Sequence, residues 1–470
     1  MGNTSKKLAA KCALLTREEQ KFIANTFRAA SKNSDKIREE DLIVSGRLDA
    51  ELLEKLWGPQ IDPRLSQFLT NYLFGQPGGT KGQSCDFNRF AELYVYNVRG
   101  TTEERLTVVY NSLGKEFTET TELPYQLLRE YCESIASTYI RIIKSSAAPC
   151  AKHWIEKGFR GKASNVQALG EATASTAGKD VDTPAMSCDS KGLYSWLQSN
   201  TLLHQMSELV FHNLYGLDRD YRSNERVDEP SASVFRNPTC SLLPDPTGIE
   251  SMPDYPAFID LCHIVWLNSH LPRKHQDKWR FLFSSHIHGE SFSTMAGRIQ
   301  ESGPSLLIVE DSSGFIFGGY ASESWQICPN FYGDDSSFLF TLAPRMRIYP
   351  ATNFNNHYQY MNQNTKTLPN GLMMGGQFEF GGIWINADPF GHGFSAESCS
   401  TYRGFKRLSK EAEFKIRSLE VWGVGEKPLT VKESDERDVS CLDMNPEAKA
   451  ILEMAGRPRH SEGVREPPPL

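Results

Sequence analysis

The sequence has no paired cysteine motif and no long apolar run, and both absences narrow the class of protein. Its ten cysteines are scattered over 470 residues without a CxxC pair. This pattern predicts reduced thiols and an intracellular protein rather than a disulfide scaffold. Apolar runs such as LLIV at 306–309 are far shorter than the roughly 20 residues of a membrane span. The N-terminus also lacks the apolar core of a secretory signal peptide.

An excess of positive charge is also lacking. The formal net charge is −7 and the pI is near 5.9, which argues against a nucleic-acid partner. Charged residues make up 23% and aromatic residues 11%, which is typical of globular proteins. The length is enough for two or three domains of ordinary size.

The N-terminus has the pattern of an N-myristoylation site. Gly2 follows the initiator methionine and precedes small polar residues, although Lys6 stands where a serine or threonine is usual. A frayed polar tail is the alternative. Because Lys6, Lys7 and Lys11 supply basic charge that would reinforce a single acyl chain, we expect Gly2 to be acylated and the membrane surface to be a partner.

Capping signals and periodic apolar residues predict helices in the first third of the chain. Thr16 and Thr101 each begin a capping-box pattern, and Asp86 precedes another apolar helical stripe. The segment from Cys85 to Gly114 is similar to the helices of EF-hand proteins. Ala91 replaces the glycine of a calcium loop and Asn97 replaces its glutamate. The sequence therefore predicts degenerate EF-hand-like helices, with calcium binding as a minor alternative.

Changes in composition predict the domain boundaries. Residues 161–190 are rich in small and polar residues, which favours a flexible linker. The predicted segments are a polar N-terminus at 1–15, a helical domain at 16–160, the linker at 161–190, a helical segment with a Pro-rich lead-in at 191–239, a mixed domain at 240–424 and a tail at 425–470.

The mixed domain is predicted to be dominated by antiparallel sheet, which makes the chain α+β. Alternation predicts a strand with Trp279, Phe281 and Phe283 on one side. Two further strands flank a turn at 311–314, and a helix is predicted from Phe292. Glycine-rich stretches lack the context of a phosphate-binding loop, so no nucleotide or other cofactor is predicted.

The stretch FSSHIHGES at 283–291 contains the residues most suited to chemistry. His286 and His288 would share a face of a strand and, with Glu290, could hold a metal. Two isolated histidines are more often ordinary side chains, so the metal site is the weaker interpretation. Ser291 could be a nucleophile, but it does not fit the Gly-x-Ser-x-Gly pattern. Helix capping by Ser291 is the better interpretation.

The tail is predicted to contain a short helix at 445–456. Asn445 is suited to the N-cap and Gly456 to the end. Ile451, Leu452 and Ala455 lie on one apolar face. The helix could pack on its own body or dock on a partner, and its charged and Pro-rich flanks favour the partner.

Several motifs of the mixed domain resemble the TLDc family. They occur in the family's order over about 170 residues: WRFLFSSHIHGESF, LLIVEDSSGFIFGGYAS, FYGDDSSFLFTL, LPNGLMMGGQ, GIWI and LEVWGVG. One departure is Met373, which stands where the family usually has the middle glycine of Gly-Leu-Gly-x-Gly-Gly. This departure puts in doubt any role of that turn that needs the backbone freedom of glycine.

The layout of the whole chain resembles the lysosomal, mTOR-associated branch of the TLDc family. This resemblance implies links to oxidation resistance, binding to the peripheral sector of the vacuolar proton pump, and recruitment of the mTOR kinase complex on the cytoplasmic face of lysosomes. No active site is established for the domain. A non-enzymatic adaptor is therefore predicted, in which exposed aromatic residues such as Phe331, Tyr332 or Phe354 contact a partner. The alternative is an oxidative-stress protein or metal-dependent enzyme that uses 286–290.

Overall fold

The computed structural model describes residues 15–32, 46–75, 85–146, 148–175, 187–217, 242–250 and 258–428. The chain divides into two units, Met1–Glu426 and Lys427–Leu470, and every described helix and strand belongs to the first. Gly2, Ile451, Leu452 and Ala455 lie outside the described residues, so acylation and the tail helix stay predictions. Within these ranges, no helix combines the length and hydropathy of a membrane-spanning segment.

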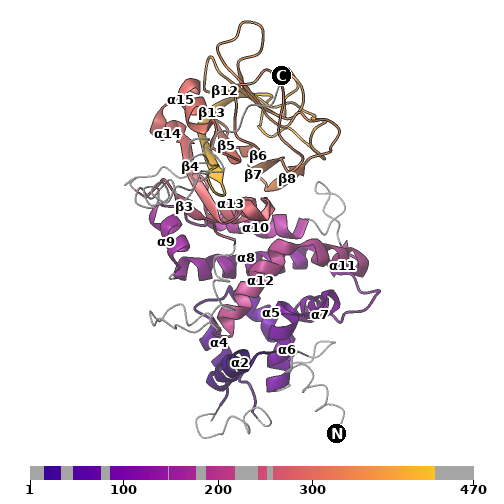
Figure 1. Cartoon of the computed structure of the whole chain (residues 1–470). Coiled ribbons are helices and arrows are strands. Elements are labelled where there is room, and N and C mark those ends of the chain that lie inside the picture. Colours follow the sequence, from indigo (N-terminus) through magenta and orange to yellow (C-terminus); the bar gives the residue numbers. More distant parts are fainter. Residues whose placement is uncertain are drawn as a thin grey trace, which may run out of the picture. The chain divides into compact units, whose positions relative to one another are not determined.

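The described chain up to residue 217 is helical, as predicted for 16–160 and for the segment that begins at 191. Its helices are α2 (Arg17–Ala29), α4 (Ala50–Trp57), α5 (Pro63–Phe74), α6 (Phe87–Val98), α7 (Thr102–Ser112), α8 (Tyr125–Ser145), α9 (Pro149–Glu156), α10 (Ala163–Ser175), α11 (Ser190–Ser199) and α12 (Thr201–Leu214). A short antiparallel pairing joins β1 (Leu123–Pro124) to β2 (Ser187–Cys188). Figure 1 shows α8 and α10 side by side in this part of the chain.

The predicted caps begin these helices. At α2, the Glu19 amide donates to Thr16 Oγ1 at 3.1 Å, and the Thr16 amide donates to Glu19 Oε2 at 2.8 Å. Thr101 forms the same reciprocal box at α7. Asp86 caps α6 by accepting a backbone amide of the first turn at 2.9 Å. The carboxylate that opens the EF-hand-like pattern therefore begins a helix.

The predicted linker at 161–190 is wrong over Ala163–Ser175, where the chain forms α10. Leu169 is buried, and Gly170 lies against α8. A Cβ added at Gly170 would come within 2.4 Å of Glu133 Cα. The small residues that favoured a linker therefore allow two helices to pack closely.

The second half of the described chain is a mixed domain in which most strand pairs are antiparallel, as predicted. Its strands are β3 (Asp245–Thr247), β4 (Lys278–Ser284), β5 (Ser305–Asp311), β6 (Ile316–Ala321), β7 (Phe338–Ala343), β8 (Arg347–Pro350), β9 (Tyr360–Asn362), β10 (Gly371–Met374), β11 (Ile383–Asn386), β12 (His392–Phe394) and β13 (Glu413–Val424). Its helical elements are α13 (Leu261–His270), η5 (Arg273–His275), α14 (Ser285–His288) and α15 (Phe292–Ile299).

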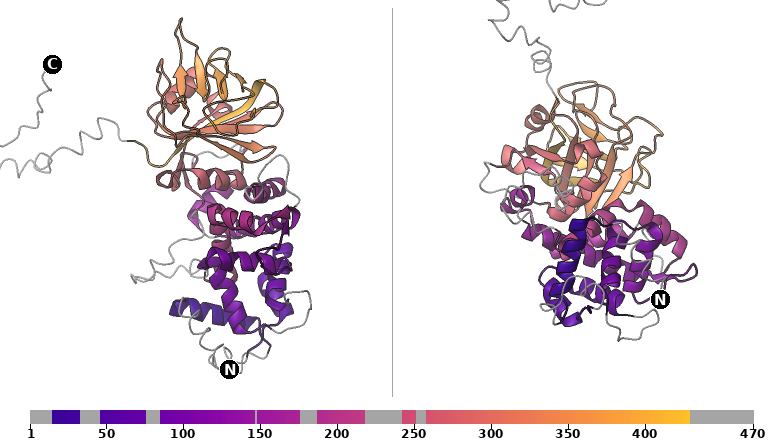
Figure 2. Two further views of the ribbon diagram at one scale, coloured as in Figure 1. Left: turned by 90° about the vertical axis from the view of Figure 1, so that its right-hand side faces the viewer. Right: turned by 60° about the horizontal axis from the view of Figure 1, so that its bottom comes forward.

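The strands form two layers joined by β13 (Figure 2). The first residues of β13 pair with β12, and the later ones pair with β5 and β4. We call β3–β8 with the later part of β13 the inner layer, and β9–β12 with its start the outer layer. One core fills the space between them, with Leu307 from the inner layer and Leu372 and Ile385 from the outer layer. A second core joins the inner layer to the helices.

The prediction that Trp279, Phe281 and Phe283 lie on one side of a strand is wrong, because β4 contains a bulge. Trp279 belongs to the core that faces the helices, and Phe281 packs against that core. Phe283 belongs instead to the core between the layers. The pairing with β13 shifts here, because Val421 pairs with Phe283 whereas the next residue pairs with Phe281. An extra residue in one strand reverses which face the following side chains occupy.

Three buried tryptophans join the helices to the inner layer. Trp154 of α9 lies 6.0 Å from Trp279 and 5.3 Å from Trp422, measured between ring centroids. The Trp154 indole donates to the Pro244 carbonyl at 2.7 Å, and that of Trp279 donates to Asn268 Oδ1 at 3.0 Å. We call Trp154, Trp279 and Trp422 the junction tryptophans. Their burial with paired N–H groups makes the two regions one packed unit.

Candidate functional site

The stretch 283–291 does not form the continuous strand that the metal hypothesis assumed. The strand β4 ends at Ser284, and Ser285–His288 form the helical turn α14. Gly289 follows with φ of +83°, a conformation that favours glycine. His286 and His288 therefore do not lie on one strand face, and that prediction is wrong.

Both histidines have local partners. His286 Nε2 lies 2.6 Å from Ser418 Oγ. The Ser284 amide donates to His288 Nδ1 at 3.1 Å, and the His288 ring stacks near Phe281 at 5.5 Å between centroids. Burial, followed by the charge of Arg298, lowers the pKa of His288. These contacts order the end of the strand.

The described residues contain no group of three or more His, Cys, Asp or Glu side chains placed to hold a metal. His286, His288 and Glu290 all lie within these residues and do not form such a group. Ser291 caps α15 by accepting the Thr294 amide at 3.3 Å, which confirms the capping interpretation. The segment offers no geometry from which to derive a reaction.

Two exposed phenylalanines lie on loops that are hydrogen-bonded to one another. Phe354 is 79% exposed and Phe380 is 65% exposed. Next to Phe354, Asn355 Oδ1 accepts from Thr401 Oγ1 at 2.8 Å, and Thr401 Oγ1 accepts from the Gly376 amide at 2.9 Å. These bonds tie the Phe354 loop to the loop that contains Phe380. We call Phe354 and Phe380 the loop phenylalanines.

The other two aromatic residues proposed for partner contact are half-buried. Phe331 stacks on His357 with 4.4 Å between centroids and also approaches Tyr360. The Tyr332 hydroxyl accepts the Gln326 amide at 2.7 Å. Both residues are therefore engaged within the domain, and Phe354 is the one of the three with a freely exposed ring.

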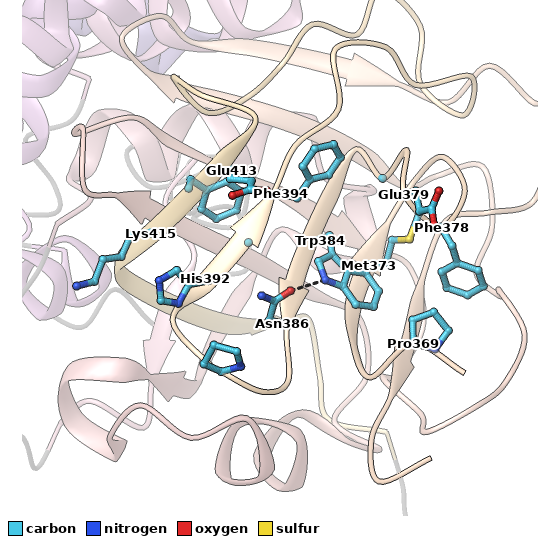
Figure 3. Close-up of a pocket in the computed structure, with 14 residues that line it drawn as sticks. Pro369, Met373, Phe378, Glu379, Trp384, Asn386, His392, Phe394, Glu413 and Lys415 are labelled. Carbon is cyan, nitrogen blue, oxygen red and sulfur yellow. Dashed lines mark hydrogen bonds between the residues drawn. The ribbon is translucent and has the colours of Figure 1, made fainter. Parts of the chain in front are cut away.

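A pocket of about 800 Å³ lies on the outer layer, on the side away from the core between the layers (Figure 3). Strand pairing places Trp384 of β11 opposite Met373 of β10 and opposite Phe394 of β12. Trp384 Nε1 donates to Asn386 Oδ1 at 2.6 Å, which fixes the indole. We call this site the outer pocket; its remaining lining residues are Pro369, Phe378, Glu379, Gly381, Pro389, His392, Gly393, Glu413, Phe414 and Lys415.

Comparison with known proteins identifies the family. The TLDc domain profile matches residues 254–425. The chain is 34% identical over 417 residues to MTOR-associated protein MEAK7 of Xenopus laevis, covering 86% of each chain. It is 36% identical to the Danio rerio protein of the same name over 79% of this chain and 77% of the relative. Nuclear receptor coactivator 7 of Homo sapiens is 32% identical over 40% of this chain and 19% of its own length.

The chain belongs to the MEAK7 family of TLDc proteins. The MEAK7 relatives match far more of this chain than the TLDc domain alone, so the family includes the helical region. The match to nuclear receptor coactivator 7 covers 192 residues, close to the size of the domain. The family therefore combines two regions that here form one packed unit.

The Met373 departure from the usual TLDc pattern does not fall in a strained turn. Met373 lies in β10, is fully buried and pairs with Tyr360 and Trp384. The positive φ angles come later, with +73° at Gly375 and +82° at Gly376. The turn therefore keeps the glycines that its backbone requires, and Met373 becomes part of the pocket floor in this MEAK7-family chain.

Sequence reasoning did not find the outer pocket or Phe380. The alternation of Trp384 between Ile383 and Ile385 was a usable signal, because a half-exposed aromatic residue then lies opposite a buried aliphatic face. Phe380 gave no such signal, since it stands in the glycine-rich turn between β10 and β11.

Proposed function

We propose that this protein is a non-enzymatic adaptor that supports mTOR signalling at lysosomes and binds the cytosolic sector of the vacuolar proton pump. The observation that carries the proposal is the match along most of the chain to relatives named for association with MTOR. An adaptor role also agrees with the architecture, because two regions share a core and present separate surfaces to partners.

The loop phenylalanines are the proposed contact with the pump. Exposed aromatic rings on an ordered surface are typical of interaction hot spots. Their loops are fixed by hydrogen bonds through Thr401, so little ordering cost is added on binding. Amide side chains surround Phe354 at Asn353, Asn355 and Asn356, which suits a wet, polar rim.

Substitution of both phenylalanines tests this contact. We expect Phe354→Ser with Phe380→Ser to reduce recovery of the pump's cytosolic sector at least tenfold in pull-downs from lysosomal extracts. Stability should change little, because both rings are exposed. Ile287→Ser is the matched control, since Ile287 is also exposed at 37% but lies on α14. Equal pump recovery by the double variant and the control would refute this contact.

Acylation of Gly2 is the proposed membrane anchor, with the nearby lysines as a second, electrostatic attachment. Gly2→Ala keeps an N-terminal amine but removes the glycine that N-myristoylation requires. We expect this variant to shift from the lysosomal fraction to the cytosol, as measured by fractionation. Unchanged lysosomal enrichment would remove the anchor from the proposal and leave the pump contact to explain localisation.

The tail helix predicted at 445–456 is proposed as a second pump contact. Deletion of these residues should weaken pump recovery, whereas Ile451→Leu should preserve it because the apolar face is kept. Equal pull-down by the deletion variant would rule out the tail. Recovery of the mTOR kinase complex, measured in the same samples, separates the two partners.

A further inference from the structure

The outer pocket contains the one tryptophan of this chain that is not buried. All eight tryptophans lie in described residues, and seven of them are at most 5% exposed. Trp384 is half-buried on the pocket floor. An indole that the fold leaves in contact with solvent, in a pocket, is available to a ligand.

The floor around Trp384 is rigid. Hydrogen bonding to Asn386 fixes the indole, and its plane lies 25° from that of Tyr360 at 6.4 Å between centroids. Met373 and Phe394 flank it through the strand pairing. The aromatic face is therefore prepared before any ligand arrives, which lowers the entropic cost of binding.

Two carboxylates border this aromatic floor. Glu413 is paired across the strands with Phe394, and Glu379 stands in the loop beside Phe378. In Figure 3, Glu413 lies beside Phe394 to one side of Trp384, and Glu379 lies beside Phe378 to the other side. Both glutamates are exposed, and within the described residues neither carboxylate has a recorded ion pair or hydrogen bond. Both are available to a positively charged ligand.

An indole face flanked by carboxylates recognises a cation. The ring attracts a positive charge placed over its face, and each carboxylate can accept charge-assisted hydrogen bonds. A guanidinium suits both contacts better than an ammonium, because it is planar, stacks on aromatic rings and donates in a fork. Lys415 also lines the pocket, opposite His392. Its positive charge would repel a cation nearby and so favours a position over Trp384.

The size of the pocket indicates that the cation comes with neighbouring groups. A volume of about 800 Å³ lies in the upper part of the range for ligand sites and exceeds what one side chain fills. Pro369, Phe378 and Met373 supply apolar contact beyond the glutamates. We propose that the outer pocket binds an arginine side chain within an extended apolar segment of a partner protein, with the guanidinium stacked on Trp384 and paired to Glu379 and Glu413. The pocket adjoins the proposed pump contact, because Glu379 and Phe380 are neighbours in one turn. Peptide binding to the isolated protein tests the pocket separately from the pump.

The test uses the full-length protein and the capped peptide acetyl-Leu-Pro-Arg-Pro-Leu-amide. A second peptide has citrulline in place of arginine, which keeps the shape and removes the charge. We expect the arginine peptide to bind at millimolar concentration or below and to protect Trp384 from quenching by acrylamide. The citrulline peptide should bind about tenfold more weakly. Trp384 dominates quenching in the native protein because the other tryptophans are buried.

Substitutions of lining residues test whether the peptide binds in the outer pocket. Glu379→Gln with Glu413→Gln should weaken the arginine peptide about tenfold and leave the citrulline peptide unchanged. Trp384→Ala should abolish binding measured by calorimetry, and Trp384→Phe should restore part of it. Lys415→Ala is the matched control and should bind the arginine peptide at least as tightly as the native protein. Equal affinity for the two peptides, unchanged binding by Trp384→Ala, or no binding at millimolar concentration would overturn the proposal.

Discussion

The junction tryptophans and Trp384 are the same residue type in opposite settings. Trp154, Trp279 and Trp422 are fully buried between the helices and the inner layer. Trp384 lies in the outer layer and is half-buried. The difference shows that the junction tryptophans contribute mainly to stability, whereas the fold leaves part of the Trp384 side chain accessible at the pocket.

The largest expected effect is the difference in stability between variants of Trp154 and of Trp384. We expect Trp154→Ala to lower the free energy of unfolding by about 3–5 kcal/mol, because a large buried side chain is lost and a cavity remains. Trp384→Ala should lower it by about 1 kcal/mol or less, since the ring already contacts solvent. Urea unfolding followed by circular dichroism measures both values. Equal losses would show that Trp384 is part of the stabilising core.

Trp154→Phe is the control for this comparison. It keeps an aromatic ring beside Trp279 and Trp422 and removes the indole that donates to the Pro244 carbonyl. Its loss should fall between those of the native protein and Trp154→Ala. A loss as large as that of Trp154→Ala would place the main contribution in the hydrogen bond rather than in packing.

The close packing of α10 on α8 should tolerate added side-chain volume less well than the exposed position Gly297 in α15. Gly170→Ala would place a methyl group within 2.4 Å of Glu133 Cα, and overpacking of this kind costs about 1–3 kcal/mol. Gly297→Ala in α15 is the matched control, since nothing lies within 4 Å of its added Cβ. It should be neutral or stabilise the protein by up to about 1 kcal/mol. Thermal and urea unfolding of both variants test the difference.

The sequence predicted most of the fold because its signals were local. The capping boxes at Thr16 and Thr101 and the cap at Ser291 depend on residues three apart, and all three formed as expected. The failures depended on distant partners. Helix α10 exists because small residues around Gly170 fit against α8, and a composition rich in such residues is typical of linkers as well.

The candidate site was harder to predict because it arises from strand pairing. The outer pocket needs β10, β11, β12 and β13 in register, which brings together residues up to 46 positions apart, from Pro369 to Lys415. The pair His286 and His288 was visible in the sequence, but the end of β4 at Ser284 separates it from any strand face. Polar residues that are close in the sequence are therefore weaker evidence for a site than residues that strand pairing brings together.

The smallest expected effect is a dependence of stability on pH, which arises from a buried histidine. His263 of α13 is buried on the inner side, and burial lowers its pKa from the ordinary value of 6.5. The unfolded chain therefore takes up a proton below pH 6.5 that the folded protein resists. Stability from this group is complete above pH 6.5 and is lost as the pH falls below it, by up to about 1 kcal/mol at pH 5.5.

Replacement of His263 by glutamine should reduce this pH dependence. We expect the difference in urea midpoint between pH 7.5 and pH 5.5 to be smaller in His263→Gln than in the native protein. Ile264→Val, in the same helix and also fully buried, should lower both midpoints and keep their difference, because it removes volume without removing a titrating group. An unchanged difference in His263→Gln would assign the acid sensitivity to another histidine with a lowered pKa, such as His204, where burial is the main cause.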